Sequence, residues 1–428
     1  MHILFLTDNF PPEVNAPASR TFEHCREWVK AGHRVTVITC APNFPQGRVF
    51  EGYRNKLLAR EIMDGIEVVR VWSYIAANEG FARRTLDYVS FMVTATLASL
   101  RVRRPDVVIA TSPQFFTACA GYLASRLRRA PFIFELRDLW PESIRAVGAL
   151  KQSWMLDWLE KLELFLYRKA AAIISVTNAF KRNLTAMGIE PGKIHVVTNG
   201  ADLSLFRPRD KEGELAEKLG LTGKFVAGYI GTHGLAHGLE TLLDAARMLQ
   251  EEGQHDIHLL FLGDGASKTA LTARAAELKL ANVTFLDTVP KADVVRYWSL
   301  LDVSVIHLRR TDLFTTVIPS KLFECMAMGI PILHGVPGES AEIVEDGRVG
   351  LTFEPENAEQ LRDRLITLSR DRQLAKELGA NGVEVARKFD RVHLADRMLH
   401  LIEGSLFADV GAQRQADEPG KTIQETLI

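Results

Sequence analysis

The stretch FVAGYIGTHGLAHGLETLLDAA, residues 225–246, contains a strand, a turn and a helix in succession. The strand part is small or apolar, as in a buried parallel sheet, and the helix part has apolar residues at helical spacing. The turn holds three glycines and two histidines: Gly231, Gly234, Gly238, His233 and His237. Glycine lets a backbone approach a diphosphate closely, and histidine can bind its oxygens. The turn therefore predicts a phosphate site; the alternative is a plain turn with surface histidines.

This strand–helix unit repeats along the chain. In the first half the strand-like runs are HILFLT, RVTVIT, IEVVRV, DVVIAT, PFIFEL, AIISVT and IHVVTN. A polar, proline-containing segment at residues 199–214 interrupts the pattern, which resumes with FVAGYIG, IHLLFLG, NVTFLD, DVSVIHL and IPILHG. The alternation predicts the α/β class, with two doubly wound, Rossmann-like domains facing each other across a cleft.

The predicted boundaries follow from these runs. Residues 1–200 form the first domain and residues 206–388 the second, and a helix at residues 390–408 packs back on the first domain. Residues 409–428 are polar, with Gly, Gln, Glu and Pro, and are expected to be disordered.

Composition narrows the possible functions. The chain has 428 residues, of which 47% are hydrophobic and 25% charged, and its net charge is -1, so nothing draws it as a whole to nucleic acid. Four scattered cysteines without clustered histidines argue against a metal site and against disulfides: Cys25, Cys40, Cys119 and Cys325. The N-terminal MHILFLTD has no basic n-region, and the longest apolar helical stretch, residues 88–100, is too short to span a bilayer. A cytoplasmic location is expected.

The stretch VIPSKLFECMAMGIPIL, residues 317–333, predicts a helix that begins at a ligand. Pro319 fixes the entry of the chain and Ser320 suits the N-cap, while Lys321 and Glu324 share one helical face. The opposite face would pack on the sheet through Leu322, Cys325, Met326 and Gly329. A helix start with a lysine suits a phosphate, and Glu324 could accept hydrogen bonds from a ribose. The alternative is a capping Ser320 with an exposed Lys321–Glu324 pair.

Ligands of doubly wound folds bind beyond the carboxyl ends of the strands. The loops at those ends are residues 8–20, 111–114, 137–143, 231–238, 263–268, 288–290 and 307–320. The first of these, DNFPPEVNAPASR, lacks a dinucleotide fingerprint, and FLGDGASK has Lys268 in place of the third glycine. An NAD-dependent dehydrogenase is therefore disfavoured.

An ordered series of motifs resembles a known family. The series is TDNFPPE, GHRVTVIT, NGAD with Phe206, GYIGTHGLAHGLETLLDAA, FLGDG, NVTFLDTV, PSKLFECMAMGIPIL and GESAEIVEDGRVGL. Over about residues 1–406 it resembles glycosyltransferase family 4, of the GT-B fold. Within that family it looks most like the bacterial L-fucosamine transferase and colanic-acid-type branch.

The resemblance implies a retaining transferase that needs no metal and no cofactor. Its donor would be a nucleotide sugar such as a UDP-sugar, held mainly by the second domain, and its acceptor a lipid-linked saccharide of a surface polysaccharide such as O-antigen or capsule. The sugar would be an N-acetylated amino sugar such as L-FucNAc or GlcNAc. The expected donor-binding residues are Gly231, Thr232, His237, Gly263, Thr288, Pro319, Ser320 and Glu324. The expected catalytic residues are Lys321, Arg137 and His233, and the acceptor side would hold Asn15, Arg137 and Asp138.

This chain departs from the family pattern at several positions. Family members commonly have two glutamates separated by seven residues; Glu324 matches the second, and Thr316 stands at the first. The usual Arg and Lys of the phosphate-binding turn fall on Thr232 and His237. A first-domain histidine of the family falls near Arg137, so Lys321 and Arg137 are the candidates to replace the missing cations.

The segment FARRTLDYVSFMVTATLASLRVRRPD, residues 81–106, has arginines on both sides of an apolar helix. These are Arg83, Arg84, Arg101, Arg103 and Arg104, and they suit peripheral contact through residues 83–104 with an anionic membrane. The resemblance implies that this would be the inner face of the cytoplasmic membrane. The alternative is that Phe91, Ala95 and Ala98 are domain core.

Two other functions stay open from sequence. One is a nucleotide-sugar epimerase, which needs acid and base groups in the cleft. The other is a catalytically silent GT-B subunit of a biosynthetic complex, which Thr316 would permit.

Overall fold

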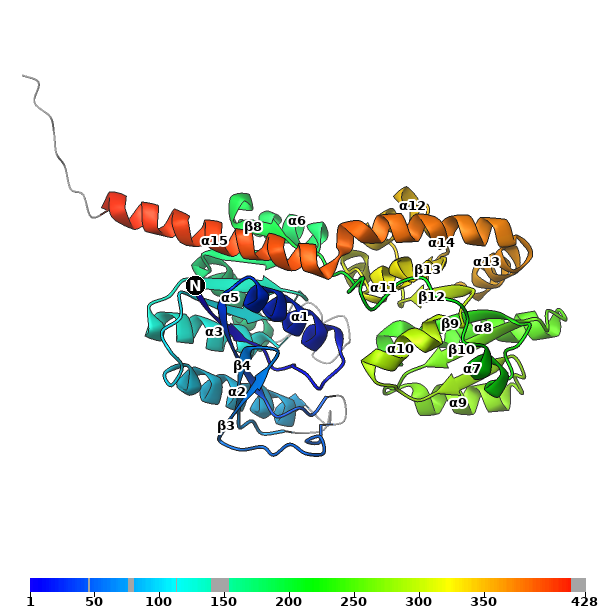
Figure 1. Ribbon diagram of the computed structural model, residues 1–428, viewed down its shortest axis with the longest axis horizontal. Coiled ribbons are helices and arrows are strands. Elements are labelled where there is room, and N and C mark those ends of the chain that lie inside the picture. The colour runs from blue at the N-terminus through cyan, green and yellow to red at the C-terminus, as the bar shows by residue number, and fades with distance from the viewer. Residues whose placement is uncertain (45–46, 76–80, 113, 140–153, 417–428) are drawn as a thin grey trace, which may run out of the picture.

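The computed structural model describes residues 1–44, 47–75, 81–112, 114–139 and 154–416. These residues form two α/β domains, each built around its own sheet (Figure 1). The two doubly wound domains predicted from the strand repeats are confirmed.

The first sheet has the order β3-β4-β2-β1-β5-β6-β7-β8, and all neighbouring strands are parallel except the pair β3 and β4. Its strands are β1 (His2–Leu6), β2 (Arg34–Cys40), β3 (Leu58–Met63), β4 (Ile66–Val71), β5 (Val107–Thr111), β6 (Phe132–Leu136), β7 (Ala172–Ser175) and β8 (Ile194–Val196). The strand β3 was not predicted; it is an edge strand without a buried residue. Edge strands lack the continuous apolar run that identifies a buried parallel strand.

Helices cover both faces of this sheet. On one face lie α2 (Phe81–Ser99), α3 (Phe115–Arg128), α5 (Trp154–Lys169) and α6 (Asn178–Ala186). On the other lie α1 (Ala16–Lys30) and α15 (Arg391–Ala416). Right-handed crossovers require this division, because the chain reverses direction across the sheet when it passes from β4 to β5.

The C-terminal helix α15 completes the first domain. Leu394, Met398 and Ile402 are buried in the same cluster as Phe5 and Trp28, although they lie at the far end of the sequence. The indole nitrogen of Trp28 donates to the carbonyl of Ala395 at 2.8 Å. The helix continues to Ala416, into the segment expected to be disordered from residue 409; residues 417–428 lie outside the described residues.

The second sheet is wholly parallel, with the order β11-β10-β9-β12-β13-β14. Its strands are β9 (Phe225–Ile230), β10 (Ile257–Leu262), β11 (Val283–Leu286), β12 (Val303–His307), β13 (Ile332–Gly335) and β14 (Gly350–Thr352), the last of which sequence missed. One face packs against α10 (Lys291–Trp298), α11 (Lys321–Ala327) and α12 (Glu339–Asp346). The other packs against α8 (Glu240–Glu251), α9 (Lys268–Glu277) and α13 (Ala358–Arg370).

The remaining elements are short or connect the domains. They are α7 (Gly213–Lys218), α14 (Arg372–Ala386), η1 (Pro191–Lys193), η2 (Leu235–His237), η3 (Asp312–Thr316) and η4 (Arg387–Phe389). Within the described part of the chain, no helix combines the length and the apolar character needed to cross a membrane.

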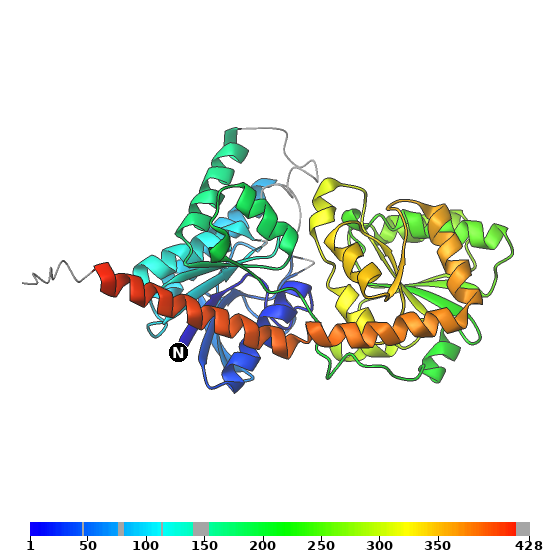
Figure 2. The same ribbon diagram turned by 90° about the horizontal axis from the view of Figure 1, so that it is seen from above.

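The chain passes between the domains at two places that lie side by side. Ala201 donates to the carbonyl of Phe389 at 3.1 Å and accepts from the amide of Arg391 at 2.9 Å. A side chain at Gly200 would come within 2.0 Å of the Phe389 carbonyl, so this close approach requires glycine. From here α15 runs back along the first domain (Figure 2).

Candidate active site

Two strand-to-helix turns of the second domain pack backbone against backbone. Gly231 follows β9 with φ 139°, and Gly263 follows β10 with φ 147°. A Cβ atom at Gly263 would lie 1.9 Å from the carbonyl oxygen of Gly231, and one at Gly265 would lie 2.6 Å from that of His233. The amide of His233 also donates to the carbonyl of Asp264 at 2.8 Å. The glycines are therefore needed to hold the two turns together.

Lys321, the first residue of α11, reaches the first of these turns. Its Nζ is buried without a hydrogen-bond partner in the described structure and lies 3.6 Å from the centroid of the Tyr229 ring. A Cβ atom at Gly231 would be only 2.9 Å from this nitrogen. Burial lowers the pKa of Lys321 to about 7, although the charge of Glu324 acts in the opposite direction. The alternative of an exposed Lys321–Glu324 pair is wrong.

Ser320 does not cap α11 as expected. Its backbone already has helical angles, φ -59° and ψ -30°, and its side chain makes no capping hydrogen bond. The turn begins one residue earlier, since the carbonyl of Pro319 accepts from the amide of Leu322 at 3.0 Å. A capping side chain needs an extended backbone to reach the following amides, and Ser320 lacks it. The predicted packing of Leu322, Cys325 and Met326 on the sheet is confirmed, since all three are fully buried.

The two histidines of the turn are not surface residues. His233 is fully buried, and neither ring nitrogen has a hydrogen-bond partner in the described structure. Its pKa is lowered to about 4 by burial and by the nearby charges of Lys268 and Lys321. Burial, together with Lys321, lowers the pKa of His237 to about 3. Both rings are therefore neutral at pH 7 and can offer hydrogen bonds but no positive charge.

The other donor-side residues lie on the loops where they were expected. Thr232 and Thr288 are exposed, and Pro319 and Ser320 are half-buried. Thr316 is held within its own turn, because its hydroxyl donates to the carbonyl of Leu313 at 2.7 Å.

Glu324 faces an ionic cluster that joins the two domains. Burial raises its pKa, while Lys291 and Arg391 act to lower it. Glu23 of α1, in the first domain, binds both of these cations: it accepts from Lys291 of α10 and lies 2.8 Å from Nη1 of Arg391. Sequence reasoning missed Glu23, Lys291 and Arg391, because a contact between residues so distant in the chain leaves no local pattern.

Arg137 lies at the carboxyl end of β6 in the first domain. Its amide donates to the hydroxyl of Ser112 at 2.8 Å, and its Nε and Nη1 are buried without a partner in the described structure. Burial lowers its pKa to about 9, which Glu135 and Asp8 oppose, so the guanidinium stays charged at pH 7. The amide of the neighbouring Asp138 also donates to Ser112, at 3.3 Å.

The side chain of Asn15 holds the start of α1 in place. Its Oδ1 accepts from the amide of Ala18 at 2.9 Å and so caps α1, and its Nδ2 donates to Asn9 at 2.5 Å. Sequence reasoning also missed Glu13 on the same loop. One carboxylate oxygen of Glu13 accepts from the amides of Asn43 and Phe44, at 2.7 and 2.8 Å, and burial raises its pKa to about 7.

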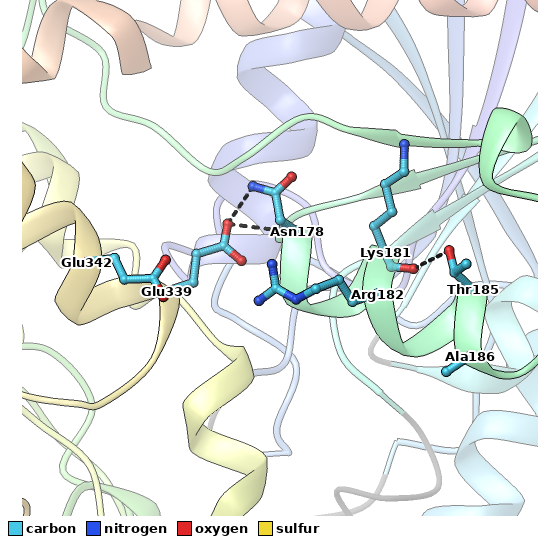
Figure 3. Close-up of a pocket in the computed structure, with 7 residues that line it drawn as sticks. All are labelled: Asn178, Lys181, Arg182, Thr185, Ala186, Glu339 and Glu342. Carbon is cyan, nitrogen blue, oxygen red and sulfur yellow. Dashed lines mark hydrogen bonds between the residues drawn. The ribbon is translucent and has the colours of Figure 1, made fainter.

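A pocket of about 580 Å³, whose lining does not include Lys321, lies between the domains (Figure 3). It is lined by Asn178, Lys181, Arg182, Thr185 and Ala186 of α6 and by Glu339 and Glu342 of α12. Glu339 accepts from the amide and side chain of Asn178, at 3.0 and 2.8 Å, and from the amide of Ala179 at 2.8 Å. A carboxylate of the second domain thus caps a helix of the first. In the part of the chain that the structure describes, no His, Cys, Asp and Glu side chains gather as a metal site would require.

Comparison with known proteins matches both halves of the chain to families. Residues 15–200 match the glycosyl transferase 4-like domain, and residues 211–385 match glycosyl transferases group 1. WcaI of Escherichia coli (strain K12), a glycosyl transferase assigned to colanic acid biosynthesis, is 27% identical over 342 residues, which cover 77% of this chain and 82% of that protein.

Two solved structures show the same fold. Anabaena HepE, solved in complex with UDP and glucose, superposes with a TM-score of 0.70 at 18% identity, covering 94% of this chain and 99% of that one. Sucrose-phosphate synthase of Thermosynechococcus elongatus gives a TM-score of 0.75 at 18% identity, covering 95% and 99%. At these identities the likeness establishes the fold alone.

Proposed function

Because this chain is built from the two domains of a family 4 glycosyltransferase of the GT-B fold, we propose that it transfers a sugar from a UDP-sugar to a lipid-linked saccharide. The product would be a lipid-linked saccharide one sugar longer, an intermediate of a bacterial surface polysaccharide. The likeness to a colanic acid transferase supports the pathway, and the UDP complexes of HepE support the donor. An N-acetylated amino sugar, such as L-FucNAc or GlcNAc, is the proposed group transferred.

The observation that carries this proposal is the unpaired ammonium of Lys321 beside the Gly231 turn. A buried charge without a partner costs several kcal/mol, and an anion placed against it removes that cost. The glycine turn leaves room for the backbone to approach such an anion. A diphosphate between α11 and residues 231–237 fits both features.

The proposed reaction breaks the bond between the anomeric carbon and the diphosphate, which keeps the bonding electrons. The acceptor hydroxyl forms the new bond on the same face of the sugar, and its proton passes to the departing phosphate oxygen. Lys321 stabilises the charge that develops on the diphosphate, and His233 and His237 act as neutral hydrogen-bonding groups. Glu324 accepts from the ribose hydroxyls.

The acceptor would lie against the first domain. Arg137 offers two unpaired nitrogens there, and Asp138 adjoins it. Asn15 shapes the neighbouring loop by capping α1. Contact across the cleft by Glu23, Lys291 and Arg391 would keep the two substrates aligned.

A catalytically silent subunit is the second candidate, and Thr316 favours it. A threonine supplies no carboxylate to the sugar at this position, and its hydroxyl is already hydrogen-bonded within η3.

Mass spectrometry of products separates the candidates. The protein is offered a panel of UDP-, GDP- and dTDP-sugars, each with and without a lipid extract that contains undecaprenyl-linked saccharides. The transferase gives a lipid product one sugar heavier, only with acceptor present. An altered sugar nucleotide formed without acceptor would identify an epimerase, and no product from any donor would favour the silent subunit.

A further inference from the structure

Three neighbouring helices of the first domain expose large apolar side chains to solvent. On α2 and just after it these are Leu86, Val93, Leu97 and Leu100, with exposed fractions of 50%, 48%, 59% and 47%. On α3 they are Leu123 and Leu127, and on α5 they are Trp158, 55% exposed, and Phe165. Exposed apolar side chains that gather on one side of a soluble protein commonly mark a binding surface.

The three helices that carry these side chains lie on the same face of the first sheet. Each helix buries its other side in the same core, through Phe91, Ala95 and Ala98 in the case of α2. The core alternative is therefore correct for those three residues, but it does not explain the opposite stripe. The ring of Phe165 on α5 packs edge-on against Tyr122 of α3 at 5.4 Å, and α2 and α3 lie side by side opposite α1 and α15 (Figure 1).

Arginines border this apolar face. Arg101, Arg103 and Arg104 follow α2, and Arg126 and Arg129 lie at the end of α3. All five are exposed, and among the described residues none forms an ion pair. Arg128 joins the two groups, since its Nη2 donates to the carbonyl of Val102 at 2.8 Å. The helix α3 itself contains no acidic residue.

We infer that the face formed by α2, α3 and α5 rests on the surface of an anionic lipid bilayer. An apolar stripe bordered by arginines is complementary to acyl chains below negatively charged headgroups, and an exposed tryptophan suits that boundary. A second copy of the chain fits poorly, because a twofold contact between identical faces would bring arginine groups together. The inference concerns binding alone and stands independently of the transfer reaction.

Vesicle co-sedimentation without any saccharide acceptor tests the inference. The wild type should pellet with phosphatidylglycerol-containing vesicles, far less with phosphatidylcholine vesicles, and less at high salt. The variant V93S/L97S should lower the partition coefficient by about tenfold or more, because it removes apolar area from the contact. Its matched control is I62S/V392S, which changes two exposed apolar residues elsewhere.

Two further variants test the breadth and the charge of the face. L127S/W158S should weaken binding as V93S/L97S does, because α3 and α5 share the contact. R103Q/R126Q/R129Q should remove the preference for anionic vesicles, whereas K218Q/K376Q/K388Q, with the same loss of charge in the second domain, should keep it. All substituted side chains are exposed, so unchanged circular dichroism is expected of each variant.

Three results would overturn the inference. The first is a wild type that does not pellet, or that pellets equally with both vesicles. The second is normal binding by L127S/W158S, which would confine the contact to α2. The third is a dimer in sedimentation velocity without vesicles that V93S/L97S dissociates, which would assign the face to a second copy.

Discussion

The ammonium of Lys321 lies against the ring of Tyr229, and burial at this site disfavours the charged form of the lysine. In the folded protein its pKa is lowered to about 7, below the usual value of 10.5. Between these values the unfolded chain holds a proton that the folded chain has lost, so this group adds stability as the pH rises. In the absence of ligand, K321M should therefore melt above the wild type at pH 7, by a margin that narrows at pH 9. Scanning calorimetry at both pH values measures the margin, with K376M as the control at an exposed lysine; a margin that widens would contradict the lowered pKa.

Glu324 supports a second prediction for a single side chain. Replacing it with glutamine keeps its shape but weakens acceptance from two ribose hydroxyls. The KM for the sugar nucleotide should rise by about tenfold, the effect of losing roughly 1.4 kcal/mol of charge-assisted hydrogen bonding, while kcat changes little. Steady-state kinetics checks this, with E342Q as the control. An unchanged KM in E324Q would remove the ribose role.

For single residues, the sequence predicts the position in an element but not the burial of the side chain. The position of Lys321 beside a helix start and the exposure of Thr232 on its loop follow from local pattern. The burial of Lys321 and His233 does not, because it depends on Tyr229, Phe261 and Phe285, which close around the turn only in the folded sheet. The cap expected of Ser320 fails for a local reason, the early turn at Pro319.

At the scale of elements, α15 follows the second domain in the sequence but packs against the first domain and stabilises it. Met398 is fully buried against the first sheet, next to exposed Arg397 on the same helix. M398A should lower the free energy of unfolding by about 2–5 kcal/mol, whereas R397A should change it little. Urea denaturation followed by far-ultraviolet circular dichroism measures both. Equal effects of the two substitutions would mean that α15 does not contribute to this core.

Elements were predicted best where one apolar run filled one strand. The buried parallel strands meet this condition. The helix at residues 390–408 was also predicted, because its apolar stripe needs a partner. The edge strands β3 and β14 do not meet the condition, because β3 (LAREIM) has two charged residues in its middle and β14 has only three residues. The continuation of α15 to Ala416 follows a polar sequence that carries no such signal.

At the scale of the molecule, the two domains are held together by charged contacts across the cleft. Glu339 accepts three hydrogen bonds from the start of α6, while Glu342, in the same pocket, is exposed (Figure 3). E339A should loosen the domains, because it leaves the amides of Asn178 and Ala179 without a partner. Small-angle scattering should show a larger radius of gyration for E339A than for the wild type, and no increase for E342A. Identical scattering from all three would mean that this contact does not set the domain arrangement.

These contacts between domains are the part of the molecule that sequence reasoning could not reach. The pattern of strands predicts two domains and a cleft, since each domain needs only its own local periodicity. The pairing of Glu23 with Lys291, or of Glu339 with α6, joins residues far apart in sequence and depends on how the domains are oriented. The sequence therefore predicts which loops form the site, but not how their side chains are placed relative to one another.

The central claim is that a nucleoside diphosphate lies against Lys321 between the two domains. Isothermal titration calorimetry with UDP tests it most directly, on the wild type, on K321M and on K224M, which alters a lysine remote from the turn. The claim predicts that UDP binds the wild type and K224M alike. K321M should bind about 30-fold more weakly, as expected from the loss of roughly 2 kcal/mol in a charged contact. Equal affinity of UDP for all three proteins, or no binding to the wild type, would contradict the claim.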